Sequence, residues 1–93
     1  MRILILGSGG REHALALKIS GSPELSKLYV APGNPGIEQL AERVSCDVAD
    51  PAQVVQMVRD LAVDLLVVGP EVPLAQGVAD AVLSEAPDCL VFG

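Results

Sequence analysis

Residues 3–10 read Ile-Leu-Ile-Leu-Gly-Ser-Gly-Gly, and this stretch decides the fold class. The aliphatic run at residues 3–6 has no polar alternation and predicts a strand buried on both faces, as the central strands of parallel sheets are. Gly7 ends the strand, and a helical pattern rich in Ala, Leu and Lys follows from Arg11 to Ile19. The segment therefore predicts a central strand, a glycine-rich loop and a helix in succession.

The alternation of short apolar runs with helical patterns continues to the end of the chain. We expect further strands at residues 28–31, 44–46, 65–68 and 90–92, a helical turn near residues 37–41, and full helices from Asp50 and from Leu74. With short connections and right-handed crossovers, this order predicts an α/β fold: a doubly wound, open, five-stranded parallel sheet with strand order 3-2-1-4-5. Residues 1–93 are expected to form one domain.

Several residues predict how the helices begin and end. Asp50 is the expected N-cap of the second full helix, with Pro51 at the first helical position and Gln53 completing a variant of the capping box at the third. Gly21 is expected to close the first helix in the left-handed conformation. Gly77 is expected to let the last helix approach the sheet closely.

Composition excludes several classes of function. The chain has 51% hydrophobic residues but only 2% aromatic residues, so its core must be aliphatic and a base-stacking surface is excluded. A net charge of -6 has the wrong sign for binding nucleic acid or an anionic membrane. No apolar run approaches the roughly 18 to 20 residues of a membrane span, and we expect no signal peptide because the apolar run after Arg2 is too short for a signal-peptide core. We therefore expect a cytosolic, cytoplasmic protein.

The cysteines are interpreted as packing residues. In the predicted strand order, Cys46 and Cys89 lie at opposite edges of the sheet, about 19 Å apart from four strand spacings. That separation is beyond the reach of a disulfide. With His13 as the one histidine of the chain, the two cysteines cannot supply a four-ligand zinc site. We predict no metal site in this chain.

The strand order also predicts where a ligand would bind. The chain leaves the first and fourth strands toward opposite faces, which opens a crevice at their carboxyl ends. The loop at residues 7–10 flanks this crevice, and its glycines permit positive φ and close approach of backbone N–H groups to a ligand. The helix N-terminus and the cation of Arg11 would add to a phosphate site. The alternative is that the glycines only form a tight turn and that Arg11 pairs with solvent or with Glu12.

A dinucleotide site fits this loop poorly. The fingerprint Gly-x-Gly-x-x-Gly has Glu12 at its sixth position here, and the second strand ends Val30-Ala31-Pro32 without a carboxylate. A P-loop is also excluded, because no Gly-Lys-Ser/Thr follows the glycines. A smaller phosphorylated ligand remains, with Glu71 placed to accept hydrogen bonds from sugar hydroxyls or an amine. Glu71 is alternatively a solvated turn acid or the N-terminal charge of the last helix.

Two more polar residues lie near the predicted crevice. His13 follows the glycine loop, where a lone histidine is more often a packing or capping residue than a base. Asn34 lies in a Pro-Gly-rich turn and is suited to making that turn. Its amide could also reach the same ligand, because the turn leaves a strand beside the first one. We predict no catalytic residue in this chain.

Three motifs together identify a family resemblance. They are GSGGREHA at residues 7–14, APGNPG at residues 31–36 and GPEVPL at residues 69–74. In this order and spacing they closely resemble the N-terminal domain of the glycinamide ribonucleotide synthetases, and the resemblance extends over the whole chain. It implies a Rossmann-like pre-ATP-grasp domain that helps to hold 5-phosphoribosylamine. The matching positions imply that Gly9, Gly10 and Arg11 face the phosphate of the ligand. They also imply that the site is lined by Glu12, Asn34, Glu71 and Pro73.

The resemblance implies an activity that this chain cannot carry out alone. The family consists of ATP-grasp ligases of purine biosynthesis that join glycine to 5-phosphoribosylamine, with ATP and Mg or Mn bound by further domains. We therefore expect residues 1–93 to be an N-terminal domain that binds no ATP or metal and is inactive in isolation, with an exposed apolar face where those domains would pack. Two alternatives are a Rossmann-type nucleotide-binding domain of an oxidoreductase and a non-catalytic interaction module.

Overall fold

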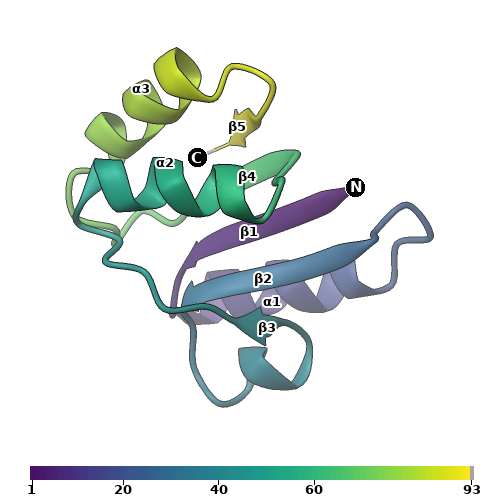
Figure 1. Ribbon diagram of the computed structural model, residues 1–93. Helices are drawn as coiled ribbons and strands as arrows, with labels where there is room; N and C mark the ends of the chain where they lie inside the picture. Colours follow the sequence, from purple (N-terminus) through teal and green to yellow (C-terminus); the bar gives the residue numbers. More distant parts are fainter. Residues whose placement is uncertain (93) are drawn as a thin grey trace.

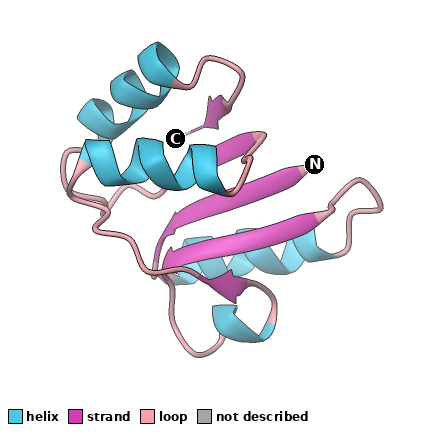
Figure 2. Ribbon diagram, viewed as in Figure 1, coloured by secondary structure: helices cyan, strands magenta, loops and turns pink. Residues whose placement is uncertain are grey.

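A computed structural model, which describes residues 1–92, shows a five-stranded parallel sheet with helices on both faces (Figure 1). The elements in chain order are β1 (Arg2–Gly7), α1 (Gly10–Ser20), β2 (Lys27–Pro32), the 3-10 turn η1 (Ile37–Gln39), β3 (Glu42–Arg43), α2 (Pro51–Asp60), β4 (Leu65–Val68), α3 (Ala75–Glu85) and β5 (Leu90–Phe92). The strand order is β3-β2-β1-β4-β5, all in parallel pairs (Figure 2). The predicted fold class and strand order are confirmed.

The alternating side chains of β1 divide the core into two layers. Ile3 and Ile5 pack with Ala16 of α1 on one face of the sheet. Leu4 and Leu6 pack on the other face, in a cluster that includes the buried valines of α2 and α3. Figure 1 shows α1 behind the sheet and α2 in front of it. Because β1 is covered on both sides, its residues must be apolar without alternation, as the sequence predicts.

The start of α2 is built largely as predicted. The side chain of Asp50 accepts a hydrogen bond from the amide of Ala52 at 3.0 Å, and Pro51 is the first helical residue. The capping-box variant at Gln53 is formed in part: its Nε2 donates to Oδ2 of Asp50 at 3.4 Å, but its Oε1 does not accept from the amide of Asp50. Its Oε1 accepts a hydrogen bond from the amide of Asp47 at 3.1 Å instead, because the connector folds back over the helix N-terminus. The helix start is therefore held by two side chains that satisfy different amides.

The third strand lies earlier than predicted. It is Glu42–Arg43, and it pairs with Tyr29 and Val30 of β2 rather than extending over residues 44–46. A strand at the edge of a sheet can consist of exposed polar residues, because its position depends on backbone hydrogen bonds to the neighbouring strand. The apolar residues Val44 and Cys46 indicate a segment that packs on the core, but they do not show that this segment pairs with the sheet. Both of those side chains do pack against the core cluster on the α2 face.

Two glycine predictions are also wrong. Gly21 has φ of -86°, in the right-handed region, so α1 ends without a left-handed residue. Gly77 is exposed, and a Cβ placed there would lie 4.0 Å from Cγ of Pro51 rather than against the sheet. Gly77 therefore lies where α3 passes the start of α2.

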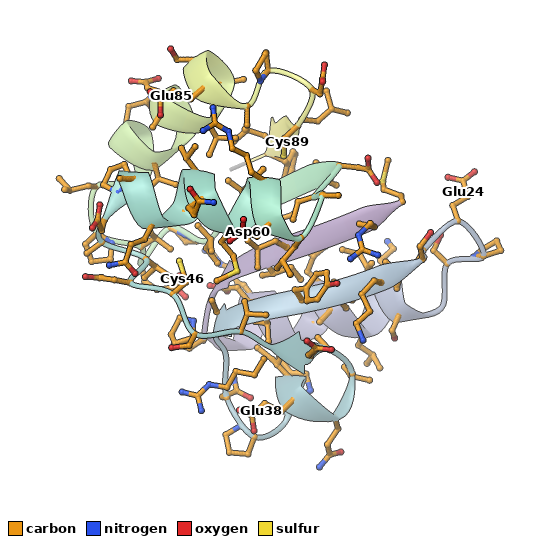
Figure 3. All side chains as sticks on the ribbon, viewed as in Figure 1. Glu24, Glu38, Cys46, Asp60, Glu85 and Cys89 are labelled. Carbon is orange, nitrogen blue, oxygen red and sulfur yellow. The ribbon has the colours of Figure 1, made fainter. Side chains whose placement is uncertain are left out.

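The cysteines are free and pack in the core as predicted. Cys89 is buried and Cys46 is half-buried, and both belong to the cluster on the α2 face (Figure 3). Burial raises the pKa of both thiols. Neither cysteine is therefore an activated nucleophile.

An exposed apolar surface lies on β5, on the same face of the sheet as α1. Leu90 is 63% exposed and Phe92 is 67% exposed, beside Leu65 and Val67 of β4. Leu65 and Val67 pack in the α1 cluster, so the neighbouring β5 side chains project toward that same face. We call Leu90 and Phe92 the β5 patch. It is the kind of apolar face that the sequence led us to expect.

No helix among residues 1–92 is long and apolar enough to span a membrane.

Candidate functional site

Three turns meet at the carboxyl ends of neighbouring strands and are bonded to one another. They follow β1, β2 and β4, and they contain the three sequence motifs. The amide of Gly33 donates to the carbonyl of Gly7 at 3.1 Å, and the side-chain amide of Asn34 donates to the carbonyl of Ser8 at 2.7 Å. From the other side, the amide of Gly69 donates to the carbonyl of Leu6 at 2.8 Å. The sheet therefore brings the motifs into one cluster, where the strand order predicted a crevice.

The glycine loop after β1 uses its glycines in different ways. Gly7 has φ of 145°, a conformation that side chains disfavour, so a glycine is required there. Gly9 is the N-cap of α1 with φ of -87° and ψ of 178°, an extended conformation open to any residue. The prediction of positive φ thus holds for Gly7 but not for Gly9. A Cβ on Gly10 would meet no atom within 4 Å, so the loop presents open space at the start of α1.

Glu71 reaches across from the β4 turn to the glycine loop. Its Oε1 accepts a hydrogen bond from the amide of Ser8 at 3.2 Å. The alternative in which Glu71 serves as the N-terminal charge of the last helix is wrong, because α3 begins at Ala75 and has no acidic residue in its first turn. Glu71 itself is exposed, so the carboxylate that binds this loop also faces solvent.

Glu12 lies underneath Glu71 rather than on the surface of the site. It is only 3% exposed, although it occupies the first turn of α1. No N–H or O–H group of residues 1–92 donates to its Oε1. The carboxyl group of Glu71 lies beside it, since a Cβ on Gly69 would overlap Oε1 of Glu12 and would lie 3.0 Å from Oε2 of Glu71, and a hydrogen bond between the two groups can form there. Two carboxyl groups form such a bond only when they share a proton. The expectation that Glu12 lines the site as an accessible side chain therefore needs correction.

The two carboxyl groups have opposite pKa shifts. Burial raises the pKa of Glu12, and the hydrogen bond and the charge of Glu71 raise it further. The neighbouring carboxyl group of Glu12 lowers the pKa of Glu71, and so does the hydrogen bond from the amide of Ser8. When the pair carries a single proton, these opposite shifts favour the proton on Glu12 and the negative charge on Glu71.

Arg11 lies on the open side of the loop. It is exposed and borders a mainly apolar pocket of about 260 Å³. The pocket is lined by Arg11, Glu12, Leu15, Val67, Val68, Gly69, Pro70 and Phe92. Because Gly10 and Arg11 lie in the first turn of α1, their amides have no acceptor within the helix. An anionic group near Arg11 would therefore meet two free helix amides and a guanidinium group.

The remaining predicted residues have mainly structural contacts. The side chain of Asn34 accepts a hydrogen bond from the amide of Ile37 at 3.0 Å and donates to Ser8, so it both forms its turn and joins it to the glycine loop. His13 packs against Gly36, where a Cβ would lie 2.6 Å from the imidazole Cε1, which supports its packing role. Pro73 is exposed beside the buried Val72, which anchors the β4 turn in the core.

Gly69 was missed as a site residue by sequence reasoning. A Cβ at this position would overlap Oε1 of Glu12 and would lie 2.8 Å from the carbonyl oxygen of Leu6. The absence of a side chain therefore lets β4 approach the glycine loop and cover Glu12. A glycine directly after a buried strand, followed by Pro70, was the available signal, but it was interpreted only as the end of the strand.

Residues 1–92 contain no group of three or more His, Cys, Asp or Glu residues that could hold a metal ion.

A family model describes this arrangement of strands and turns. The model for the phosphoribosylglycinamide synthetase N domain matches residues 1–93. The chain belongs to this family. The family assignment confirms the resemblance seen in the three motifs and identifies the glycine loop, the Asn34 turn and the Glu71 turn as parts of a phosphoribosylglycinamide synthetase N domain.

Curated relatives of this N domain carry one name. The chain is 55% identical over 93 residues to the phosphoribosylamine-glycine ligase of Mesorhizobium japonicum, covering 100% of this chain and 21% of the relative. It is 50% identical over 93 residues to the ligase of Rhizobium meliloti, covering 100% of this chain and 22% of that relative. It is 47% identical over 89 residues to the ligase of Mycobacterium tuberculosis strain H37Rv, covering 96% of this chain and 21% of that relative. The chain therefore spans about a fifth of the length of the curated relatives that it matches.

A solved structure shares the fold. Apo saccharopine dehydrogenase from Saccharomyces cerevisiae superposes with a TM-score of 0.67 at 17% identity, over 91% of this chain and 20% of that one. At this identity the similarity shows the Rossmann-like fold of the N domain alone and lends no support to an oxidoreductase function.

Proposed function

We propose that this chain is the substrate-binding N domain of a phosphoribosylamine-glycine ligase. That enzyme joins glycine to 5-phosphoribosylamine in purine biosynthesis with cleavage of ATP. The observation that carries the proposal is the convergence of the three family motifs at one point of the sheet, where Ser8 bonds to both Asn34 and Glu71. A site whose walls come from separate strands, at the point where the strand order reverses between β1 and β4, is typical of ligand binding in doubly wound parallel sheets.

The charges of the site favour one orientation of the substrate. The carboxylate of Glu71 occupies the Ser8 end of the glycine loop and would repel a phosphate there. The phosphate is better accommodated at Gly9, Gly10 and Arg11, where the first amides of α1 and a guanidinium group can donate. The hydroxyls or the amine of the ribosylamine would then donate to Glu71, with Asn34 and Pro73 beside it. In this proposal Glu12 supports the site from beneath.

ATP and a divalent metal would be bound outside this chain. Residues 1–92 do not provide a metal-ligand cluster, and no step of phosphoryl transfer is assigned to them. Glycine activation by ATP would therefore need the remaining domains of the ligase, whose curated members are about five times longer than this chain. A cytoplasmic location is consistent with this role and stays a prediction.

The β5 patch is proposed as a contact with those domains. Phe92 is 67% exposed and borders the pocket beside Arg11, so a domain packed there would also close one side of the substrate site. A right-handed connection after β5 would place a following helix on the face of α3, so it would leave this patch bare. Another domain of the same ligase is therefore the best candidate to cover it.

A chimera tests the proposed function directly. Residues 1–93 would replace the matching segment of the Mesorhizobium japonicum ligase, with which they share 55% identity. Arg11→Ala and Glu71→Ala should each raise the KM for phosphoribosylamine about tenfold or more, because each removes a hydrogen bond to a charged group, while the KM for ATP stays unchanged. Lys18→Ala is the matched control, since it removes one positive charge from the far end of α1.

Unchanged kinetics in both site variants would support the alternative of a non-catalytic interaction module with structural glycines. Equal increases in the KM for ATP and for phosphoribosylamine would instead indicate a general disturbance of the enzyme. A crystal of the chain soaked with ribose 5-phosphate gives an independent check. Density away from the glycine loop and the Glu71 turn would contradict the site assignment.

A further inference from the structure

The buried position of Glu12 is the feature that the proposed function leaves unexplained. Its side chain is 3% exposed in a slot between two glycines, Gly7 and Gly69. A Cβ on either glycine would overlap Oε1 of Glu12. Gly7 ends β1 and Gly69 directly follows β4, and these two strands are hydrogen-bonded neighbours, so the slot is fixed by the sheet itself. The two glycines therefore leave space for a buried carboxyl group, although burial of an apolar side chain at this position would cost less free energy.

The carboxyl group of Glu12 lies beside that of Glu71, which faces the open side of the site. The two carboxyl groups lie together at Gly69, and Oε1 of Glu71 accepts a hydrogen bond from the amide of Ser8 at 3.2 Å. These two contacts approach the Glu71 side chain from the α1 side and from the glycine loop. They restrict the rotation of a side chain that would otherwise move freely in solvent.

We propose that Glu12 is a positioning residue of the ligase, which acts through Glu71 and does not touch the substrate. Its protonated carboxyl group donates a hydrogen bond to Glu71 and holds that carboxylate against the amide of Ser8, so that the same side of Glu71 always faces the ligand. This inference rests on the proposed function, because it takes Glu71 to be the group that meets the hydroxyls or the amine of 5-phosphoribosylamine.

The proposal makes a distinction between two substitutions of nearly equal size. Glu12→Gln keeps an N–H donor for Glu71 and should preserve its position. Glu12→Leu fills the slot without a donor and should release Glu71. In the ligase chimera, we expect the KM for phosphoribosylamine to stay within about threefold for Glu12→Gln and to rise about tenfold for Glu12→Leu, the loss expected for one charge-assisted hydrogen bond. Because a positioning residue acts on binding of this substrate, the KM for ATP and kcat should change little.

A double-variant comparison tests whether Glu12 acts through Glu71. Once Glu71→Ala is present, Glu12→Leu should produce no further rise in the KM for phosphoribosylamine, since the group that it positions is gone. Additive effects of the two substitutions would overturn the proposal. A chimera in which Glu12→Gln is as impaired as Glu12→Leu would overturn it as well.

The dependence on pH gives a second test that does not need the leucine variant to fold. The charged groups around Glu12 are Glu71 from the β4 turn and Arg11 from its own helix, while His13 faces Gly36. When the shared proton is lost at high pH, the unmodified chimera should lose affinity for phosphoribosylamine. The chimera with Glu12→Gln should keep it. Identical pH profiles for the two would contradict the role of the shared proton.

NMR of the 93-residue chain separates this inference from the proposed function. The amide of Ser8 reports whether the Glu71 carboxylate is in place, whatever the ligand is. We expect the Ser8 amide shift to be retained in Glu12→Gln and to move toward the value of Glu71→Ala in Glu12→Leu. If Glu71→Ala leaves the kinetics of the chimera unchanged while the Ser8 shifts follow this pattern, the proposed function fails and the positioning contact stands. If the Ser8 shift in Glu12→Leu equals that of the unmodified chain, the positioning role is refuted.

Discussion

Replacement of Gly69 by alanine should destabilise the domain. The added Cβ would overlap Oε1 of Glu12 and would lie 2.8 Å from the carbonyl oxygen of Leu6 and 3.0 Å from Oε2 of Glu71. The Glu71 side chain can move away, but the Leu6 carbonyl belongs to the central strand and cannot. Overpacking of this kind costs about 1 to 3 kcal/mol. In a domain of this size each kcal/mol lowers Tm by roughly 4 to 8 °C.

The measurement is thermal and urea unfolding of the 93-residue chain, followed by far-ultraviolet circular dichroism. Gly10→Ala is the matched control, because a Cβ there would meet no atom within 4 Å. Its stability should be unchanged or increased by up to about 1 kcal/mol, since alanine suits a helix better than glycine. Adding Glu12→Ala to Gly69→Ala should recover part of the loss, because one of the three close contacts is then removed. Equal stability of Gly69→Ala and Gly10→Ala would refute the close approach of the β4 turn to the glycine loop.

Four further outcomes are expected. Burial raises the pKa of Glu12, so the stability that this group contributes is full below its ordinary value of 4.5 and is lost as pH rises through the raised value. In urea unfolding, the stability of the Glu12→Gln variant relative to the unmodified chain should therefore increase as the pH rises from 4.5 toward neutral. If the stabilities of the two chains changed in parallel with pH, this expectation would be wrong. Asp50→Ala should cost about 1 kcal/mol in the same assay, because the N-cap of α2 is lost. Leu66→Ala should cost about 2 to 5 kcal/mol because Leu66 is fully buried, whereas Leu83→Ala, at an exposed position, should stay within about 0.5 kcal/mol. Finally, the 93-residue chain should not consume ATP when it is supplied with glycine and phosphoribosylamine, and any turnover would show that the activity does not require further domains.

The sheet could be predicted because its buried strands are short runs of consecutive apolar residues. An unbroken aliphatic run at residues 3–6 indicates a strand covered on both faces, and the chain does place that strand in the centre. The edge strand was placed wrongly because Glu42 and Arg43 carry no apolar signal, and their pairing with β2 depends on register alone. The pattern of apolar residues therefore predicted the buried strands correctly, but it did not predict the edge strand, whose side chains are exposed to solvent.

The position of the candidate site in the fold could be predicted from the sequence, but the contacts within it could not. The meeting of the glycine loop, the Asn34 turn and the Glu71 turn followed from the strand order. The burial of Glu12 did not, because it depends on the approach of Gly69 from a strand far along the chain. Likewise, the contact between Glu71 and the amide of Ser8 joins two turns that no sequence pattern connects. The sequence predicted which residues the three turns contain, but the difference between the buried Glu12 and the exposed Glu71 required the structure.

The hydrogen bonds among the three turns have a consequence for movement. Gly33 and Asn34 are bonded to the glycine loop from one side, and Gly69 and Glu71 are bonded to the β1 strand and its loop from the other. Turns connected in this way keep their mutual geometry when the whole domain is displaced. If a longer ligase closes around its substrate, we therefore expect this half of the site to travel as a rigid body, with the hinge outside residues 1–92.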